Sequence, residues 1–339
     1  MVEDLRGKTA VRALDKQFVG DLENGLLAPV AEAVRSDSTL CLELRGTYIN
    51  VYYRGGKLME IAKASCGYRP KFDKNYFGGE KKKKIEAPTF LTQPEHVDNW
   101  LEVWPWLKRA MDRYLAGTKG SYEREFQQLF VRDNNCGRIK RGAKQSIEYK
   151  DGSIARSTDY YICDLEYTRS GESWQFDMIA VHWPSDRQQR KISDNRRLAI
   201  VEVKYGDNAL DDPAGLVEHI KDVNSFLGNP DKVDDLKKDM VRVFNQKRQL
   251  GLMDCRRDLK SFSDERPILL LALVNHDPDS TKLRNILGKL PESPNADLRL
   301  GTASFFGYGL YDQGVHTVDE MHTRFGEYIY NSLGNNIRK

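Results

Sequence analysis

A carboxylate and an ammonium group stand two positions apart in an apolar run, Ala199-Ile200-Val201-Glu202-Val203-Lys204-Tyr205. Successive side chains of a strand alternate between its two faces, so Glu202 and Lys204 are predicted to point to the same side. A buried strand rarely holds such charges unless they are paired or bind an ion. Of the five acid-x-Lys triplets in the chain, only this one lies in an apolar strand pattern. Its context therefore marks it for chemistry.

A second acid lies in the preceding predicted strand, Trp174-Gln175-Phe176-Asp177-Met178-Ile179-Ala180-Val181. Adjacent strands lie about 4.8 Å apart, so Asp177 and Glu202 can converge on one hard cation. Such a cation is Mg²⁺, with Mn²⁺ as a substitute, because it takes oxygen ligands and keeps several waters. The Val203 carbonyl could add a further oxygen. Lys204 is then placed to orient or deprotonate a water, or to stabilise charge on a phosphate.

A structural interpretation of these charges stays open. Glu202 and Lys204 could form a salt bridge on a half-exposed strand, with Asp177 as a surface acid. Asp164 and Glu166, on the first strand of this region, are spare ligand candidates, but a solvent face of an edge strand is favoured. His219 or Lys221, on the helix after Lys204, could reach phosphate, but a surface position is favoured. The three tryptophans at positions 100, 104 and 106 are expected to pack in the core or between domains.

The elements around these residues predict an α/β domain. Residues 122–130 carry an amphipathic helix pattern, and strands are expected over 160–168, 173–183 and 197–205. Two helices follow with Pro213 and Pro230 at their first positions, and then an unbroken apolar strand over 267–274. Further on we expect a helix over 280–290, a strand over 303–311, and a capping box formed by Thr317 and Glu320. This order predicts a mixed central sheet flanked by helices.

The order helix, Asp strand, Glu-x-Lys strand, helix, strand resembles the PD-(D/E)XK nuclease superfamily, over residues 120–275. The resemblance implies a restriction-endonuclease-like fold and a Mg²⁺-dependent endonuclease that hydrolyses DNA phosphodiester bonds, with Asp177, Glu202 and Lys204 as catalytic residues and Asp177, Glu202 and Val203 at the metal. The helix acid of the family would be Glu123 or Glu125. Glu123 is preferred because Glu123-x-x-Phe126-Gln127 is similar to the helix of some defence-associated members. Phe176 replaces the usual proline, and no Gln-x-x-x-Tyr follows Lys204.

The N-terminal part is predicted to be a small α+β domain, residues 1–95, ahead of a nuclease-like domain over 96–339. Residues 1–35 read as helical with a break at Pro29, and strands are expected over 40–44, 48–53 and 58–61. Residues 65–90 are expected to form an exposed loop at the domain boundary. The segment 45–54 mixes aromatic and basic side chains on a hairpin, namely Arg45, Tyr48, Tyr52, Tyr53 and Arg54, together with Asn50. They could stack nucleic-acid bases or pack against the second domain.

Charge adds a modest signal for nucleic acid. The net charge is only +3, but basic residues cluster in two short segments. Solvated loops could explain either cluster, and phosphate contacts are the alternative. The residues proposed to bind the nucleic-acid backbone are Arg138, Lys140, Arg141, Lys144, Lys82 and Lys83. DNA is expected before RNA from the resemblance alone, and a homodimer is a further expectation.

Composition excludes several classes of protein. No C-x-x-C pair, Walker A loop or G-x-S-x-G elbow occurs, and the five cysteines are scattered as expected of reduced thiols. No apolar run reaches the length of a membrane span, so we expect a cytoplasmic protein without a membrane partner. The alternative function is a non-catalytic nucleic-acid-binding protein, or an interaction protein that needs a partner, on the same fold.

Overall fold

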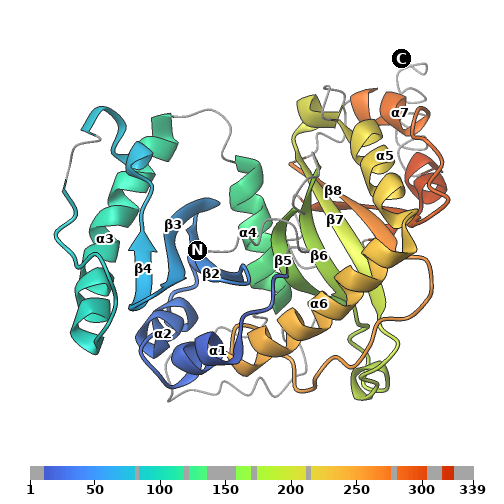
Figure 1. The fold of residues 1–339 in the computed structure, drawn as a ribbon. Helices are drawn as coiled ribbons and strands as arrows, with labels where there is room; N and C mark the ends of the chain where they lie inside the picture. The colour runs from blue at the N-terminus through green and yellow to red at the C-terminus, as the bar shows by residue number, and fades with distance from the viewer. Residues whose placement is uncertain are drawn as a thin grey trace, which may run out of the picture.

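The computed structural model describes residues 11–80, 84–117, 122–135, 158–168, 174–210, 215–275, 281–303 and 315–323. Two sheets organise these residues. A four-stranded sheet lies toward the N-terminus and a six-stranded sheet holds the rest (Figure 1). The predicted α/β class is therefore confirmed. No helix in these ranges is both long enough and apolar enough to cross a bilayer.

The six-stranded sheet is mixed and runs in the order β10-β9-β8-β7-β6-β5. Strands β5, β6 and β7 form an antiparallel meander, while β8 and β9 are parallel to β7. Every residue of β8 is buried, as its unbroken apolar sequence predicts. The strands are β5 (Tyr160–Thr168), β6 (Gln175–His182), β7 (Arg197–Tyr205), β8 (Ile268–Val274), β9 (Asp297–Ala303) and β10 (Val315–His316).

Helices cover both faces of this sheet. Helix α4 (Tyr122–Asn135) packs on one face, where alternate β7 residues such as Val201 and Val203 meet Phe130. Helices α5 (Leu216–Leu227) and α6 (Pro230–Gln249) cover the other face (Figure 1). The even-numbered residues of β7, including Glu202 and Lys204, point toward α5. The shared face predicted for these two residues is thus confirmed.

The N-terminal sheet is an antiparallel meander, β1 (Leu40–Leu44), β2 (Tyr48–Tyr53), β3 (Gly56–Ala64) and β4 (Gly67–Lys71). The expectation of a loop over residues 65–90 was wrong at β4 and at η2 (Lys74–Glu80). Tyr68 and Pro70 are buried while Arg69 and Lys71 are exposed, which is the alternation of a strand. Pro70 is tolerated because β4 is the edge strand of its sheet.

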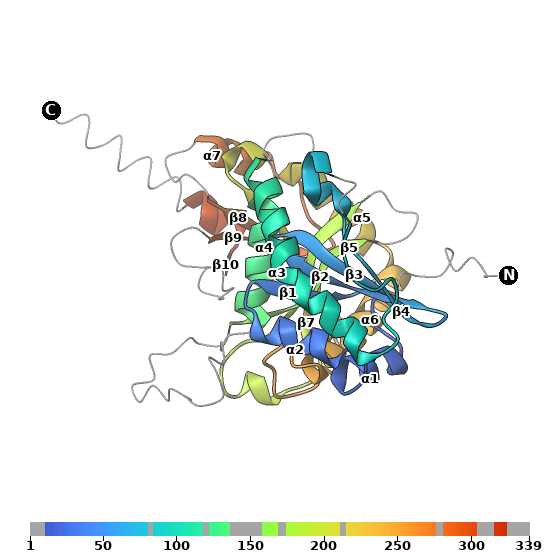
Figure 2. The same cartoon turned by 90° about the vertical axis from the view of Figure 1, so that its left-hand side faces the viewer.

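The helices differ from the predictions mainly at their ends. Residues 16–36 form two helices, α1 (Lys16–Glu23) and α2 (Ala28–Ser36), and Pro29 lies in the first turn of α2. Helix α3 (Pro94–Gly117) packs against α2, β3 and η2, beside the N-terminal sheet (Figure 2). The capping box is confirmed by reciprocal hydrogen bonds between Thr317 and Glu320.

Some predicted boundaries shift. Helix α5 begins at Leu216, three residues after Pro213, and Pro213 lies outside the described residues. Most of the strand expected over 303–311 also lies outside them. Strand β9, over residues 297–303, was not predicted, and α7 (Thr281–Leu287) is shorter than the helix expected over 280–290. Helix α6 begins at Pro230 as predicted, and Asn229 caps it by accepting a hydrogen bond from the Lys232 N–H.

Buried ion pairs join the two sheets. The Lys247 ammonium lies 2.7 Å from both carboxylate oxygens of Glu43, and the Arg45 guanidinium donates to Asp164 at 2.5 Å. Arg12 reaches the same Asp164 carboxylate at 3.1 Å. The surface position expected for Asp164 is wrong, because the strand bulges after Ile162 and the carboxylate is fully buried.

Contacts between the two sheets also bear on the two uses expected for the basic and aromatic residues of the N-terminal sheet, which were base stacking and packing. Arg45 and Tyr52 pack against β5, where the Tyr52 hydroxyl donates to Glu166 at 2.9 Å. Arg54 pairs with Asp112 and Glu125. These side chains are therefore engaged in packing rather than in an open base-stacking surface. The predicted domain boundary at residue 95 stays a prediction.

Candidate active site

The candidate site lies where the six-stranded sheet forks. Cα pairing between β6 and β7 ends at Met178 and Val201, whereas β6 stays paired with β5 as far as Gln175, and β7 with β8 as far as Tyr205. Asp177 and Glu202 are the next residues beyond the last β6–β7 pair. The Val203 N–H, which has no β6 backbone partner there, donates to Asp177 Oδ2 at 2.7 Å. The fork therefore places both acids side by side, as the sequence predicted.

Glu202 is a buried carboxylate whose charge the surrounding protein compensates only in part. Its side chain is fully buried, and neither oxygen accepts an aligned hydrogen bond. Burial raises the pKa of Glu202 to about 8, and the nearby Lys204 lowers it only in part. An ionised carboxylate in this position needs a positive partner, because an unpaired buried charge is strongly unfavourable.

Asp177 shares this condition. Burial raises the pKa of Asp177 well above its usual range, and the negative charge of Glu202 raises it further. The Val203 N–H acts in the opposite direction by stabilising the ionised form. Two adjacent carboxyl groups with raised pKa values are what a divalent cation would bring back to the charged form.

Lys204 and His219 complete the cluster. Lys204 is almost fully buried, and its Nζ lies 2.9 Å from His219 Nε2. His219 Nδ1 lies 3.0 Å from Glu202 Oε2, so the imidazole bridges the two residues of the Glu-x-Lys motif. Burial lowers the pKa of His219, and the charge of Lys204 lowers it further. The ring is therefore neutral near pH 7, and Nε2 can accept a hydrogen bond from the ammonium.

His219 is the residue that the sequence interpretation missed, since a surface position was expected. The signal was present in the helix pattern. Leu216, Ile220 and Val223 form the buried stripe of α5, and position 219 falls on the same stripe by its spacing. A histidine on the apolar side of the helix that follows the motif strand must meet that strand. Lys221, in contrast, is exposed and pairs with Glu218, as expected.

The first turn of α4 carries both candidate helix acids, and the choice between them stays a prediction. Glu125 is held by Arg54 at 3.0 Å. Glu123 acts on the site instead, because its negative charge raises the pKa of both Asp177 and Glu202. Stacking of Tyr122 on Tyr205, with ring centroids 5.4 Å apart, fixes this turn at the end of β7. The structure thus brings Glu123 toward the cluster, as preferred from the sequence.

The fit to a metal ion rests on two adjacent buried carboxyl groups, Asp177 and Glu202, of which Glu202 has no aligned hydrogen bond. Within the part of the chain that the structure describes, no group of three or more His, Cys, Asp or Glu side chains is close enough to hold a metal ion. An ion here would take Asp177 and Glu202 and complete its shell with waters, as Mg²⁺ does. The Val203 carbonyl as a third ligand stays a prediction.

The residues predicted to hold the nucleic-acid backbone cannot be placed. Arg138, Lys140, Arg141, Lys144, Lys82 and Lys83 all lie outside the described residues.

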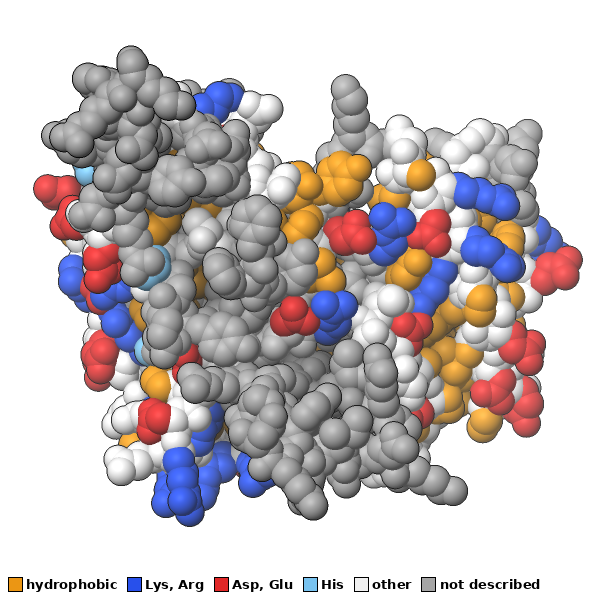
Figure 3. All heavy atoms as spheres, turned by 180° about the vertical axis from the view of Figure 1, so that it is seen from behind, with side chains coloured by type: hydrophobic (Ala, Val, Ile, Leu, Met, Phe, Trp, Pro, Cys, Tyr) orange, Lys and Arg blue, Asp and Glu red, His pale blue; other side chains and the backbone are white. Residues whose placement is uncertain are grey.

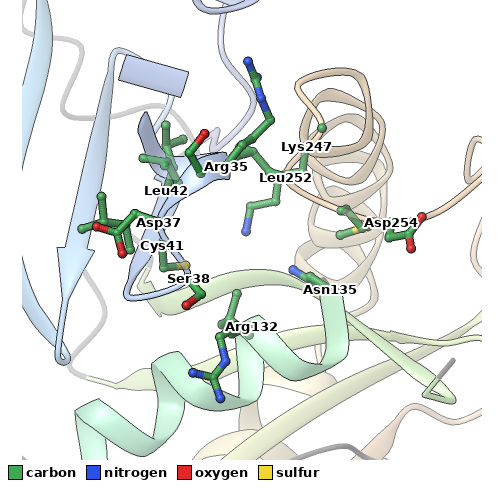
Figure 4. A pocket seen from close by; sticks show the side chains of 16 residues that line it. Arg35, Asp37, Ser38, Cys41, Leu42, Arg132, Asn135, Lys247, Leu252 and Asp254 are labelled. Atoms are coloured by element: carbon green, nitrogen blue, oxygen red, sulfur yellow. The ribbon is translucent and has the colours of Figure 1, made fainter. Parts of the chain in front are cut away.

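A separate cavity of about 440 Å³ lies between the N-terminal sheet and α4 and α6 (Figure 4). Its charged side chains are engaged with protein groups: Lys247 with Glu43, Asp37 with Lys108, and Arg132 with Asp133. The Arg35 guanidinium donates to the Leu250 carbonyl at 2.8 Å. The cavity therefore lies between packed elements, whereas the candidate site holds the buried Glu202 carboxyl group.

Comparisons with protein-family models, with curated proteins and with solved structures each found no match. The function proposed below therefore rests on the geometry of the site.

Proposed function

We propose that this protein is a divalent-metal-dependent nuclease that hydrolyses nucleic-acid phosphodiester bonds, on a restriction-endonuclease-like fold. The observation that carries the proposal is Glu202, a fully buried carboxylate without an aligned hydrogen bond, next to Asp177 and two residues from Lys204. The charge of Lys204 lowers the pKa of Glu202 only in part, and the Lys204 ammonium lies 2.9 Å from His219 Nε2.

The order of elements supports the same proposal. Helix α4, the meander of β5, β6 and β7, helix α5 and the parallel strand β8 follow each other as in the family that the sequence resembles. Asp177 lies on β6, Glu202 lies on β7, and Glu123 lies in the first turn of α4. DNA is the proposed substrate before RNA, and hydrolysis within the strand is the proposed mode.

The residues of the site have separable roles. Asp177 and Glu202 would hold Mg²⁺ or Mn²⁺, with Glu123 reaching it directly or through a water. The ion, when bound, would activate a water and stabilise the charge on the leaving oxygen. Lys204 donates hydrogen bonds toward the phosphate and the attacking water. His219 is a positioning residue, since its neutral ring holds Lys204 Nζ at 2.9 Å.

One observation favours the rival, a nucleic-acid-binding protein without catalysis. Among the described side chains no three-ligand metal group is present. In that case the two carboxyl groups would stay protonated, and nucleic-acid binding would not depend on metal or on Asp177.

The test is incubation of the full chain with end-labelled DNA and RNA, single- and double-stranded, in Mg²⁺, Mn²⁺ or EDTA. We expect cleavage with either metal and none in EDTA. The Glu202→Gln variant should lose cleavage while the matched exposed variant Glu218→Gln keeps it. Binding that is unchanged by EDTA and by Asp177→Ala, with no cleavage of any substrate, would establish the rival.

A further inference from the structure

A groove lies between η2 and α3, away from the candidate active site. Its volume is about 420 Å³, and four of its eight lining residues are aromatic and two are arginines. The aromatic and basic side chains are Tyr76, Phe77, Trp106, Arg109, Arg113 and Tyr114. In the cavity of Figure 4, by contrast, Lys247, Asp37 and Arg132 pair with neighbouring charged residues.

The α3 side of the groove is one helix face. Trp106, Arg109, Ala110, Arg113 and Tyr114 follow the spacing of three and four residues that puts side chains in one row. The rings from η2 meet this row: Phe77 lies 5.1 Å from Trp106, and Tyr76 lies edge-on to Tyr114 at 5.3 Å. Trp106, expected from the sequence to pack in the core or between domains, is partly buried against the core, and Tyr114 is 37% exposed. The groove therefore presents aromatic surface to solvent.

The two arginines have no acidic partner. Arg109 and Arg113 are exposed and four residues apart on α3, and neither forms an ion pair within the described ranges. Like charges at this spacing repel each other. The nearest acid in the sequence, Asp112, is engaged by Tyr53 and Arg54 at 3.0 Å each. Two guanidinium groups beside these rings are thus available to an anionic ligand.

Contacts connect the groove to the candidate active site. Tyr76 packs on the β2–β3 turn, where a side chain at Gly56 would meet its hydroxyl at 2.7 Å. The neighbouring Gly55 lies against the backbone of Arg124, in the first turn of α4. That turn also carries Glu123. Helix α4 lies between α3 and the six-stranded sheet (Figure 1), so a strand leaving the site can cross its first turn to reach the groove.

We infer that this groove binds a single-stranded segment of nucleic acid, with bases stacked on the rings and phosphates held by Arg109 and Arg113. The inference rests on the proposed function, because it assigns the groove to the substrate of that site. A single strand fits because its base faces are free to stack, whereas a duplex covers them. Charges of both signs are mixed over the described surface seen from behind (Figure 3), so local geometry, rather than a strong overall field, supplies the affinity.

The test measures anisotropy of fluorescein-labelled dT20 and U20 with the full chain in EDTA, where cleavage is absent. The Arg109→Gln/Arg113→Gln variant should bind at least tenfold more weakly. The slope of log K against log salt should fall by about 1.4, since each phosphate contact on a single strand contributes about 0.7. Tyr114→Leu should weaken binding at least fivefold through lost stacking. The matched control is Arg256→Gln/Arg257→Gln, which removes two exposed arginines outside the groove.

The outcomes separate the groove from the catalytic proposal. Binding by the groove variant equal to wild type, or no binding of either oligonucleotide by wild type, overturns the groove. Preference for a 20-base-pair duplex or for a proline-rich peptide of equal length also overturns it. Weakened binding in a chain that shows no metal-dependent cleavage supports the groove and refutes the nuclease. The dT20 and U20 arms distinguish DNA from RNA, and thermal melting confirms that the exposed variants fold.

Discussion

Glu202 is the residue on which the proposed function depends most. Its carboxyl group is buried without an aligned hydrogen bond, and its pKa is raised to about 8. The unfolded chain would lose this proton near pH 4.5, so between these values the folded state binds one proton more. By linkage, this group lowers the free energy of unfolding as pH rises through that window, by up to about 1.4 kcal/mol per pH unit.

We therefore predict a pH-dependent gain in stability for Glu202→Gln. In EDTA, the variant should exceed wild type in free energy of unfolding by on the order of 2 kcal/mol at pH 8, and by much less at pH 5. Urea unfolding at both pH values measures the difference. Glu218→Gln, exposed on α5, should leave the pH slope unchanged. Equal slopes for wild type and Glu202→Gln would show that Glu202 ionises normally.

A second prediction concerns His219, which positions Lys204. His219→Gln should lower kcat about tenfold with little change in KM, because Lys204 loses its fixed partner while substrate binding remains. The pH–rate profile should change with it, since the neutral ring no longer contacts both Glu202 and Lys204. A change in KM alone would contradict this role.

For the strands of the larger sheet, the sequence predicted their positions and also which side chains share a face. Alternation in β7 placed Glu202 and Lys204 on one face, and strand adjacency placed Asp177 beside them. The fork between β6 and β7 could not be predicted, because it depends on which neighbour each strand keeps beyond Met178 and Val201. Strand β4 was missed because Gly67 and Pro70 favoured a loop, although burial at positions 68 and 70 alternates as in a strand.

The β2–β3 turn provides a test at this scale. Gly55 has a φ of +72°, and a Cβ there would lie 2.4 Å from the Arg124 carbonyl carbon. Gly55→Ala should lower the free energy of unfolding by about 2 kcal/mol or more and displace the first turn of α4, which carries Glu123. Gly20→Ala, in α1 with no atom within 4 Å of the added Cβ, should instead stabilise by about 0.5–1 kcal/mol. Thermal melting compares the two variants, and equal effects would contradict the close approach.

At the scale of the whole molecule, buried ion pairs fix the N-terminal sheet to the larger one. Glu43 and Lys247 are 204 positions apart in sequence, and Asp164 meets both Arg12 and Arg45. Such partners could not be predicted from a single sequence, because no local pattern selects one distant charge over another. The sequence therefore predicted the site better than the joint between the two sheets.

Breaking one of these pairs should be costly, and removing both partners much less so. Lys247→Met leaves the Glu43 carboxylate buried without its main partner and should destabilise by about 3 kcal/mol. Adding Glu43→Gln should recover most of that loss, because no buried charge is then left unpaired. Urea unfolding of the single and double variants measures the coupling. Additive losses in the double variant would show that the pair contributes nothing as a pair.

The proposed function requires that the Asp177–Glu202–Lys204 cluster cut nucleic acid with the help of a divalent ion. The most direct measurement is Mg²⁺-dependent nicking and linearisation of a supercoiled plasmid by wild type beside Lys204→Ala, with Lys221→Ala as the matched lysine control. We predict cleavage by wild type and Lys221→Ala, at least a hundredfold loss in Lys204→Ala, and none in EDTA. Cleavage by Lys204→Ala at the wild-type rate would contradict the proposed function.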